Sequence, residues 1–401
     1  METLSRSSSP LFSPIFETVT ACAADESNWE ELKALLELSF ETNKSSKVDP
    51  ACIERIETII KEISLAGSLP DQIKLLKLFE NYTFFFTDKF FTIVLKQIAI
   101  SYPEIQRYFY REGLYGNPII SLEGVSSILH FFELEYKFPE GCLSCQTIAN
   151  LPKLIEEIML STELELTKGF VIQSAPHDPH LVPIFITKHG PSVNVLISDS
   201  MGHTISMLER NWEMSEIKAI ITTFQHQAKY FENLKIYSYA LKRQNDNVSC
   251  PIFCTLDLKN LYERQLSTDE TIFDFLTTYS HPRLITPEIV RDCGLLIYEV
   301  ELLPPEMMKV TQSYTALKTY ASHSPKLEGS MTPCFIRKSP EGAQVFSFQT
   351  MDVLNRSVMR AKCISPTSRE ESKYVDKKRW GFIIQILESH FRNRRCIAIE
   401  D

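Results

Sequence analysis

Apolar residues in the N-terminal part of the chain recur every three to four positions, which is the period of an amphipathic helix. The first predicted helix carries its apolar face on Trp29, Leu32, Leu36 and Phe40. Ser27 and Glu30 form a capping box at its start. The second helix begins with Asp49 as N-cap and Pro50 in its first turn. Its apolar face comprises Ile53, Ile56, Ile60 and Ile63.

Further helical segments complete this region. Pro70 starts a helix whose apolar face holds Ile73, Leu76 and Phe79, and residues 90–100 and 151–160 also show helical periodicity. We therefore expect residues 25–165 to form a helical region, whose apolar stripes are core and carry no chemistry. Residues 1–24 are rich in serine and contain proline, which predicts a disordered leader.

The pattern changes near residue 168, where short β-rich runs replace the helical period. Four strands are predicted, at residues 169–173, 181–187, 193–198 and 235–241. One helix spans 215–227 with Ile217, Ile220, Ile221 and Phe224 inward, and another follows Cys250 with Ile252, Phe253, Leu256 and Leu261 inward. This mixture predicts an α+β domain over residues 166–270. In the remaining part, residues 271–401, helices are expected near 313–322 and 377–389.

Composition places the chain among ordinary globular proteins. Its 401 residues predict two or three domains, and 44% apolar with 23% charged residues suffices for a buried core. The formal net charge of −9 argues against a general nucleic-acid binder, whose surface would be basic. The most apolar run, residues 90–95, is too short for a transmembrane segment, and no secretory signal peptide is visible.

The cysteines indicate reduced thiols. Ten cysteines without an export signal are not the density of a disulfide scaffold. Cys142 and Cys145 form a CxxC pair, but a zinc site would need a second pair, or histidines at matching spacing, nearby. We therefore expect no metal.

His180 and Asp199 are candidates for a catalytic base and the group that orients it. His180 starts one predicted strand, and Asp199 ends the next, after a turn at residues 188–192. In an antiparallel hairpin, a residue that starts one strand lies beside a residue that ends its neighbour. The two side chains can therefore meet without any long-range assumption.

Cys250 is the candidate nucleophile. It follows a polar loop and precedes Pro251, which suits the first turn of a helix. At a helix N-terminus, free N–H groups and the helix dipole favour a thiolate. Gln244, six residues earlier, can offer its amide as an oxyanion donor beside the Cys250 N–H. The order His, Asp, Gln and Cys is the combination that a cysteine-nucleophile enzyme needs.

Other residues compete for these roles. Cys254 has apolar neighbours one helical turn later and is expected to be inert core. His189 and His177 are the rival bases, but His189 lies in the turn, at the wrong end of the hairpin for Asp199. A lone cysteine or histidine is more often structural, so these features alone leave catalysis and structure equally open.

At these residues the chain resembles the ubiquitin-like-protease clan of cysteine enzymes. Gln244 and Cys250 match the clan's spacing of six residues, and Asp199-Ser200 is similar to the Asp-Ser that ends its second strand. The nineteen residues from His180 to Asp199 equal the interval between base and acid in the YopJ-type effector acetyltransferases of this clan.

Two C-terminal stretches extend the resemblance to the YopJ type. Residues 303–313, LPPEMMKVTQS, followed by Leu317 and Tyr320, resemble that family's segment LPxxFYKHTQS. Residues 375–379, VDKKR, are similar to its VHKKR. The resemblance implies a papain-like, ubiquitin-like-protease core within an α+β fold, with a helical N-terminal region. It also implies a C-terminal α/β extension, residues 271–401, that packs on the core as a regulatory and cofactor-binding part.

The functional implication is an enzyme that moves acetyl from acetyl-CoA to Cys250 and then to Ser, Thr or Lys of host signalling proteins. Such effectors leave a bacterium through a specialised system without a signal peptide, act in the host cytoplasm and are activated by inositol hexakisphosphate. The cofactor-binding positions implied by the matching segments are Lys309, Thr311, Ser313, Lys377, Lys378 and Arg379. A polyanion would need such a basic pocket.

The chain departs from the family pattern at several positions. Pro251 stands where the family usually has glycine, Asp199 where many members have glutamate, and Val310 where the segment has histidine. The fifty-one residues from Asp199 to Cys250 are nearer the interval of the clan's proteases. An isopeptidase for ubiquitin or a ubiquitin-like protein is therefore the alternative function. A catalytically inactive binding module, with residues 25–165 as its interaction surface, is a third hypothesis.

Overall fold

The chain divides into two compact units, residues 1–74 and residues 75–401. The computed structural model describes residues 26–42, 49–81, 88–110, 118–173, 180–202, 216–227, 233–244, 246, 248–267, 269–285, 295–308, 310–313, 316, 320, 331–338, 344–350 and 370–397. The predicted leader, residues 1–24, lies outside this set, as does most of the helix predicted over 313–322.

Unit 1 contains helices α1 (Glu26–Thr42) and α2 (Pro50–Ala66) and the start of α3 (Leu69–Asn81). The predicted start of α2 is confirmed, because the Asp49 carboxylate accepts a hydrogen bond of 3.0 Å from the Ala51 N–H. The apolar stripes of α1 and α2 are buried over Trp29, Leu32, Leu36, Ile56, Ile60 and Ile63.

Two details of the helical prediction are wrong. Ser27 is not the N-cap, because α1 already includes Glu26, and the Glu30 carboxylate binds Lys33 at 2.7 Å. Ile53 is 42% exposed, because the buried face of α2 begins one turn later, at Ile56. The apolar face of a helix is buried only along the turns that a neighbouring element covers, so an isoleucine in an uncovered first turn stays exposed.

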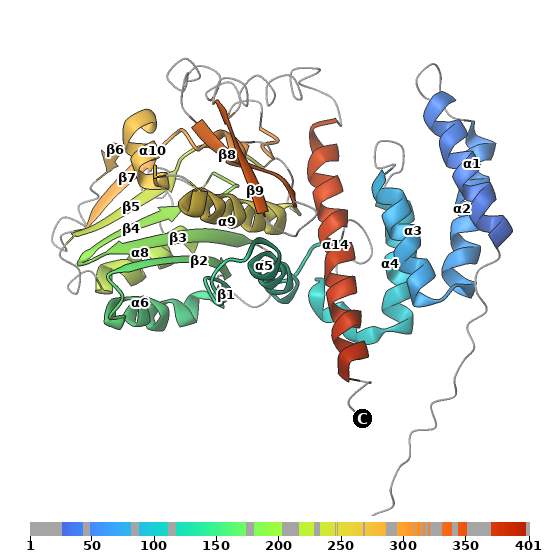
Figure 1. The fold of residues 1–401 in the computed structure, drawn as a ribbon, viewed down its shortest axis with the longest axis horizontal. Helices are drawn as coiled ribbons and strands as arrows, with labels where there is room; N and C mark the ends of the chain where they lie inside the picture. The colour runs from blue at the N-terminus through green and yellow to red at the C-terminus, as the bar shows by residue number, and fades with distance from the viewer. Residues whose placement is uncertain are drawn as a thin grey trace, which may run out of the picture. The chain divides into compact units, whose positions relative to one another are not determined.

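Helices α4 (Asp88–Ser101), α5 (Leu122–Tyr136) and α14 (Glu370–Ile397) pack together in unit 2 (Figure 1). Phe91 of α4 stacks on Trp380 of α14 with ring centroids 4.0 Å apart. Phe132 of α5 meets Phe382 of α14 edge to face at 5.8 Å. A 3-10 helix, η1 (Pro103–Tyr108), connects α4 to the segment before α5. The helix expected over 377–389 is thus the middle of the longer α14.

A seven-stranded mixed sheet forms the centre of unit 2, in the order β1-β2-β3-β4-β5-β7-β6. The predicted strands are β2 (Glu165–Gln173), β3 (Leu181–His189), β4 (Ser192–Ile197) and β5 (Asn233–Tyr239). The strands that the sequence pattern missed are β1 (Leu143–Thr147), β6 (Arg283–Ile285) and β7 (Leu296–Val300). A separate hairpin pairs β8 (Met331–Lys338) with β9 (Gln344–Thr350).

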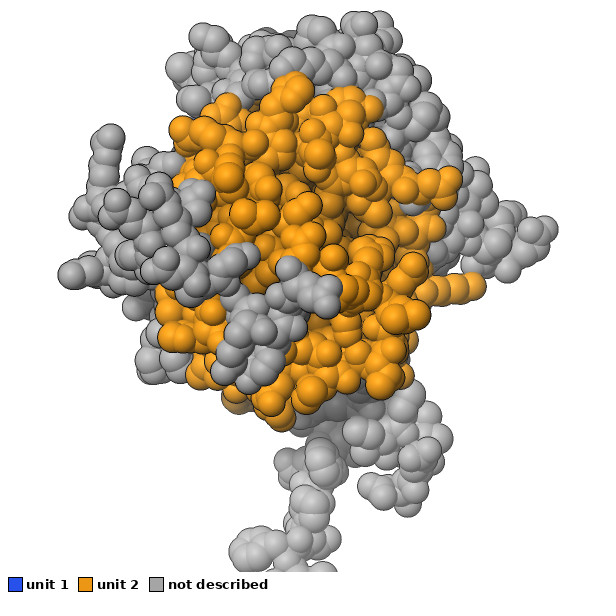
Figure 2. Space-filling view, turned by 90° about the vertical axis from the view of Figure 1, so that its left-hand side faces the viewer, with its two compact units in different colours: residues 1–74 blue, residues 75–401 orange. Residues whose placement is uncertain are grey.

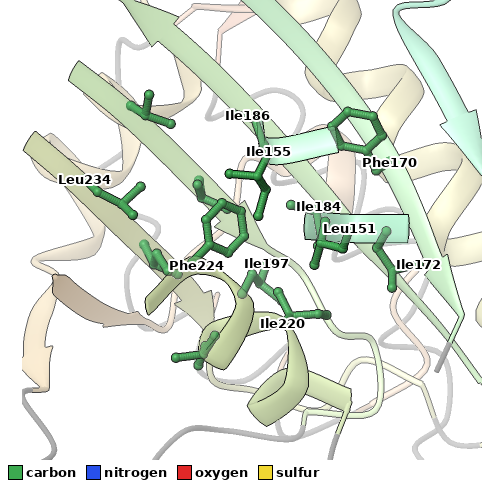
Figure 3. Close-up of a cluster of buried hydrophobic side chains, with 14 of the residues drawn as sticks. Leu151, Ile155, Phe170, Ile172, Ile184, Ile186, Ile197, Ile220, Phe224 and Leu234 are labelled. Carbon is green, nitrogen blue, oxygen red and sulfur yellow. The ribbon is translucent and has the colours of Figure 1, made fainter. Parts of the chain in front are cut away.

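Helices cover both faces of the sheet (Figure 1). On one face, α6 (Leu151–Leu160) and α8 (Glu216–Gln227) bury Ile155 and Phe224 against strand side chains such as Ile184 and Ile197 (Figure 3). On the other face lies α9 (Cys250–Ser267), whose Tyr262 meets Phe185 of β3 edge to face. The described side chains of unit 2 form a continuous surface in the space-filling view (Figure 2).

The predicted α+β class with a helical N-terminal region is confirmed. No helix among the described residues is long and apolar enough to cross a membrane. The described part of the chain also holds no cluster of three or more His, Cys, Asp or Glu side chains that could bind a metal ion. The domain boundaries at residues 24, 165 and 270 stay predictions.

Candidate active site

The β3–β4 hairpin brings His180 and Asp199 to one edge of the sheet. The strands are antiparallel with Ile184 opposite Ile197, so the start of β3 lies beside the end of β4. The turn at the other end includes Gly190, whose φ of 56° suits glycine. Across the edge, His180 Nε2 lies 3.3 Å from Asp199 Oδ1.

Cys250 reaches this edge from the N-terminus of α9. Because α9 packs on β3, its first residue faces the start of that strand, and Cys250 Sγ lies 3.3 Å from His180 Nδ1. The helix opens with Ile252 N–H and Phe253 N–H donating to the Ser249 carbonyl. Pro251 occupies the first turn, where its missing N–H removes no intrahelical hydrogen bond. The thiol is 3% exposed.

The Gln244 side chain is fixed at both ends of its amide. Ser200 Oγ donates to Gln244 Oε1 at 2.7 Å, and Gln244 Nε2 donates to the Asp246 carbonyl at 2.5 Å. The same nitrogen lies 3.3 Å from Cys250 Sγ. The amide therefore offers an N–H beside the sulfur, where an oxyanion would form.

The electrostatics of the site favour a positive imidazole. Burial by itself lowers the pKa of His180, but hydrogen bonds to Asp199 and Cys250, together with the charges of these groups, raise it to about 11. His180 is then an imidazolium at neutral pH, and its positive charge lies beside Cys250 Sγ.

Two of the three competing residues, Cys254 and His189, lie in different surroundings from the predicted set. Cys254 is fully buried, donates to the Leu181 carbonyl at 3.2 Å, and has a thiol pKa that burial raises well above its usual value. His189 pairs with Ser192 at the far end of the hairpin. His177 lies outside the described residues. The structure therefore brings together the four residues that the sequence predicted.

A family model described as YopJ Serine/Threonine acetyltransferase matches residues 131–384, which is more than half of the chain. The chain belongs to the YopJ acetyltransferase family. It is thus an acyltransferase by family.

Solved structures of three proteins are distantly similar to this YopJ-family chain. An AvrA deletion variant with IP6 and CoA is 14% identical, with 73% of this chain and 98% of that chain covered and a TM-score of 0.40. HopZ1a in complex with IP6 is 13% identical, with 80% and 98% covered and a TM-score of 0.38. A protease of ASFV is 13% identical, with 46% and 78% covered and a TM-score of 0.23. No curated protein matches the chain.

The segment that resembles the YopJ-type TQS motif lies against the residue before Gln244. The N–H groups of Gln312 and Ser313 donate to the Arg243 carbonyl at 2.7 and 3.1 Å. The side chains of Thr311 and Ser313 are buried. Lys309, a predicted cofactor-binding residue, lies outside the described residues.

The basic residues of the VDKKR segment lie on α14. Lys377 and Lys378 are partly exposed. Arg379 is 1% exposed, and its guanidinium donates to Asp376 at 2.8 Å and to Ser249 Oγ at 2.9 Å. Arg379 therefore contacts the loop that leads to Cys250.

Three further functional residues escaped the sequence prediction. Ser200 orients Gln244, and its carbonyl also accepts the N–H groups of Arg243 and Gln244. Arg243, the residue before Gln244, forms a fully buried ion pair with Asp257. The Asp-Ser motif was a signal for Ser200, but no local pattern indicates that an arginine and an aspartate fourteen positions apart will pair.

Proposed function

We propose that this chain is a cysteine-dependent acetyltransferase that moves acetyl from acetyl-CoA through Cys250 to Ser, Thr or Lys side chains of host proteins. One observation carries the proposal. In a YopJ-family chain, His180 lies 3.3 Å from both Asp199 and Cys250, and the Gln244 amide contacts the same sulfur.

The first half-reaction follows from the charges of the site. The Cys250 thiolate attacks the thioester carbonyl carbon, and a new carbon–sulfur bond forms. The carbonyl oxygen becomes an oxyanion, for which Gln244 Nε2 and the Cys250 N–H are the donors. When the bond to the CoA sulfur breaks, His180 gives its proton to the departing thiolate and becomes neutral.

The second half-reaction restores the starting state. The acceptor hydroxyl or amine gives a proton to neutral His180 and attacks the acetyl group on Cys250. The carbon–sulfur bond to Cys250 breaks, and the thiolate–imidazolium pair is formed again. Asp199, at 1% exposure, keeps the imidazole oriented and stabilises its positive form through both steps.

We propose inositol hexakisphosphate as the activating polyanion. Among the described candidates, the residues Lys377 and Lys378 are partly exposed. The Arg379 guanidinium instead binds within the protein, and Thr311 and Ser313 are buried. This difference in burial favours Lys377 and Lys378 over Arg379, Thr311 and Ser313 as direct phosphate ligands. Lys309 stays a candidate through the sequence resemblance alone. Delivery from a bacterium, action in the host cytoplasm and a host signalling protein as acceptor are parts of the same proposal, supported by family membership.

Intact mass spectrometry of the full chain tests the proposal. The protein is incubated with acetyl-CoA and inositol hexakisphosphate and, in parallel, with a ubiquitin propargylamide probe. Cys250→Ala removes the nucleophile, and Cys254→Ala is the matched control because it removes a buried thiol one turn away. An acetyl group that Cys250→Ala abolishes and Cys254→Ala preserves is the expected result. No acetyl gain would overturn the proposal, and a Cys250-dependent ubiquitin adduct would establish the isopeptidase instead.

A further inference from the structure

The loop before Cys250 is folded around the side chain of Asp246. Its Oδ1 accepts from the N–H groups of Val248 and Ser249 at 2.9 and 2.8 Å. Its Oδ2 accepts from Ser249 Oγ and from Gln312 Nε2, both at 2.7 Å. The backbone carbonyl of Asp246 accepts from Gln244 Nε2. One residue therefore binds both the loop and the amide that faces the catalytic sulfur.

Two segments distant in the sequence hold this aspartate. Gln312 belongs to the segment 310–313, and Arg379 of α14 donates to Ser249 Oγ, which in turn donates to Asp246. Burial by itself raises the pKa of Asp246, but the hydrogen bonds from Gln312, Ser249 and Val248 lower it below the usual value. The carboxylate is thus ionised and can accept all four bonds.

The position of the Asp246 carbonyl matters because it selects the direction of the Gln244 amide. Gln244 Nε2 carries two hydrogens; one is used by this carbonyl, and the other can face Cys250 Sγ at 3.3 Å. If the loop relaxes, the carbonyl turns and the amide loses the acceptor that fixes its direction. An oxyanion donor displaced by about 1 Å can cost on the order of 100-fold in rate.

We propose that Asp246 is a positioning residue that directs the Gln244 amide toward the oxyanion, and that Gln312 holds Asp246 in place for this task. The inference rests on the proposed function of Cys250 as an acyl-accepting nucleophile. It assigns a role in the reaction to a residue that touches neither the sulfur nor the substrate.

Two reagents that attack the same sulfur separate this role from a structural one. Acylation of Cys250 by p-nitrophenyl acetate passes through an oxyanion, whereas alkylation by iodoacetamide does not. Gln244→Ala sets the reference, with acylation slowed about 100- to 1,000-fold and alkylation little changed. Asp246→Asn should slow acylation about 10- to 100-fold and leave alkylation at the wild-type rate. The surface variant Asp269→Asn, with the same change in charge, should alter neither rate.

A reciprocal exchange tests the contact with Gln312. Gln312→Glu places two carboxylates against each other and should slow acylation as Asp246→Asn does. In the double variant Asp246→Asn with Gln312→Glu, the amide introduced at position 246 can donate to the carboxylate introduced at position 312. The polarity of the bond is then reversed, and most of the lost acylation rate should return.

The outcomes distinguish the inference from the function on which it rests. Equal loss of acylation and alkylation in Asp246→Asn would mean that the loop merely supports the fold, and loss of neither would mean that Asp246 has no role. Either result overturns the inference. Failure of acetyl-CoA to modify the wild type, while p-nitrophenyl acetate acylates Cys250, overturns the proposed function alone.

Discussion

Removing one partner of the Arg243–Asp257 ion pair should destabilise the protein far more than removing both. Both side chains are fully buried, and the guanidinium binds the carboxylate through two nitrogens, one of them 2.9 Å from Asp257 Oδ1. The substitution Asp257→Ala leaves the charged Arg243 without its counter-ion. Arginine cannot escape this cost by losing its proton.

The size of the effect follows from the contacts that remain. Breaking a buried ion pair by removing one partner costs about 3–5 kcal/mol. In Asp257→Ala, Arg243 keeps Ser198 Oγ at 2.9 Å and the Met307 carbonyl at 3.1 Å. Because these acceptors remain, the expected loss in the free energy of unfolding lies near the lower end of that range, at about 3 kcal/mol. The double variant Arg243→Met with Asp257→Leu leaves no buried charge and should lie within about 1 kcal/mol of the wild type.

Urea unfolding followed by circular dichroism measures each free energy of unfolding. The control is Glu157→Ala, which removes an exposed ion pair with Lys153 on α6 and should cost about 0.5 kcal/mol or less. The reasoning is refuted if Asp257→Ala costs no more than this control. It is equally refuted if the double variant is as unstable as the losses of its single variants, Arg243→Met and Asp257→Leu, added together, because the pair would then have no coupling energy.

Three further predictions concern the site. Gly202 has a φ of 72°, and a Cβ there would lie 2.4 Å from the Lys242 backbone nitrogen. Urea unfolding should therefore show that Gly202→Ala lowers the free energy of unfolding by about 1–3 kcal/mol or more. In native protein, iodoacetamide should label Cys250 and leave Cys254 unlabelled, because burial raises the pKa of the Cys254 thiol. Peptide mass spectrometry measures the labelling of each cysteine. The pKa of His180 rises from 6.5 to about 11 on folding. Its pairing therefore stabilises the folded state fully below pH 6.5, and this stabilisation is lost as the pH rises toward 11. The stability gap between wild type and His180→Gln, followed by urea unfolding, should therefore shrink across that range.

The fold was predictable where a segment's own pattern decides its burial. The expected helix over 151–160 coincides with α6, and the expected strands coincide with β2 to β5. Helix α5 lies within the predicted helical region 25–165 but was not singled out as a helix, and it contains Gly124, a poor helix former. The structure explains this glycine, since a Cβ would lie 2.6 Å from the Tyr108 carbonyl oxygen. Strand β1 is polar and half-buried, so only its pairing with β2 makes it a strand.

The site was predictable to the extent that it is local. His180 meets Asp199 within one hairpin, and Gln244 meets Cys250 within one loop. The meeting of His180 with Cys250, seventy positions away, was expected from the chemistry of a catalytic set and not from periodicity. Contacts across the chain outside that set were not predictable, because no periodicity relates their members. Gln312 binds Asp246 from sixty-six positions away, and Arg379 binds Ser249 from one hundred and thirty. The sequence motifs around these residues indicate the family, but only the fold shows which atoms they contact.

Pro251 follows Cys250, the proposed nucleophile, where the family usually has glycine, and this departure is compatible with the proposed reaction. The donors placed to serve an oxyanion at Cys250 are its own N–H and Gln244 Nε2, and neither depends on the nitrogen of residue 251. In the first turn of α9, proline also removes no intrahelical hydrogen bond. Proline at position 251 therefore keeps the hydrogen bonds of the helix and the two proposed oxyanion donors. The Gln244 donor depends on Ser200 and Asp246, which hold its amide in place.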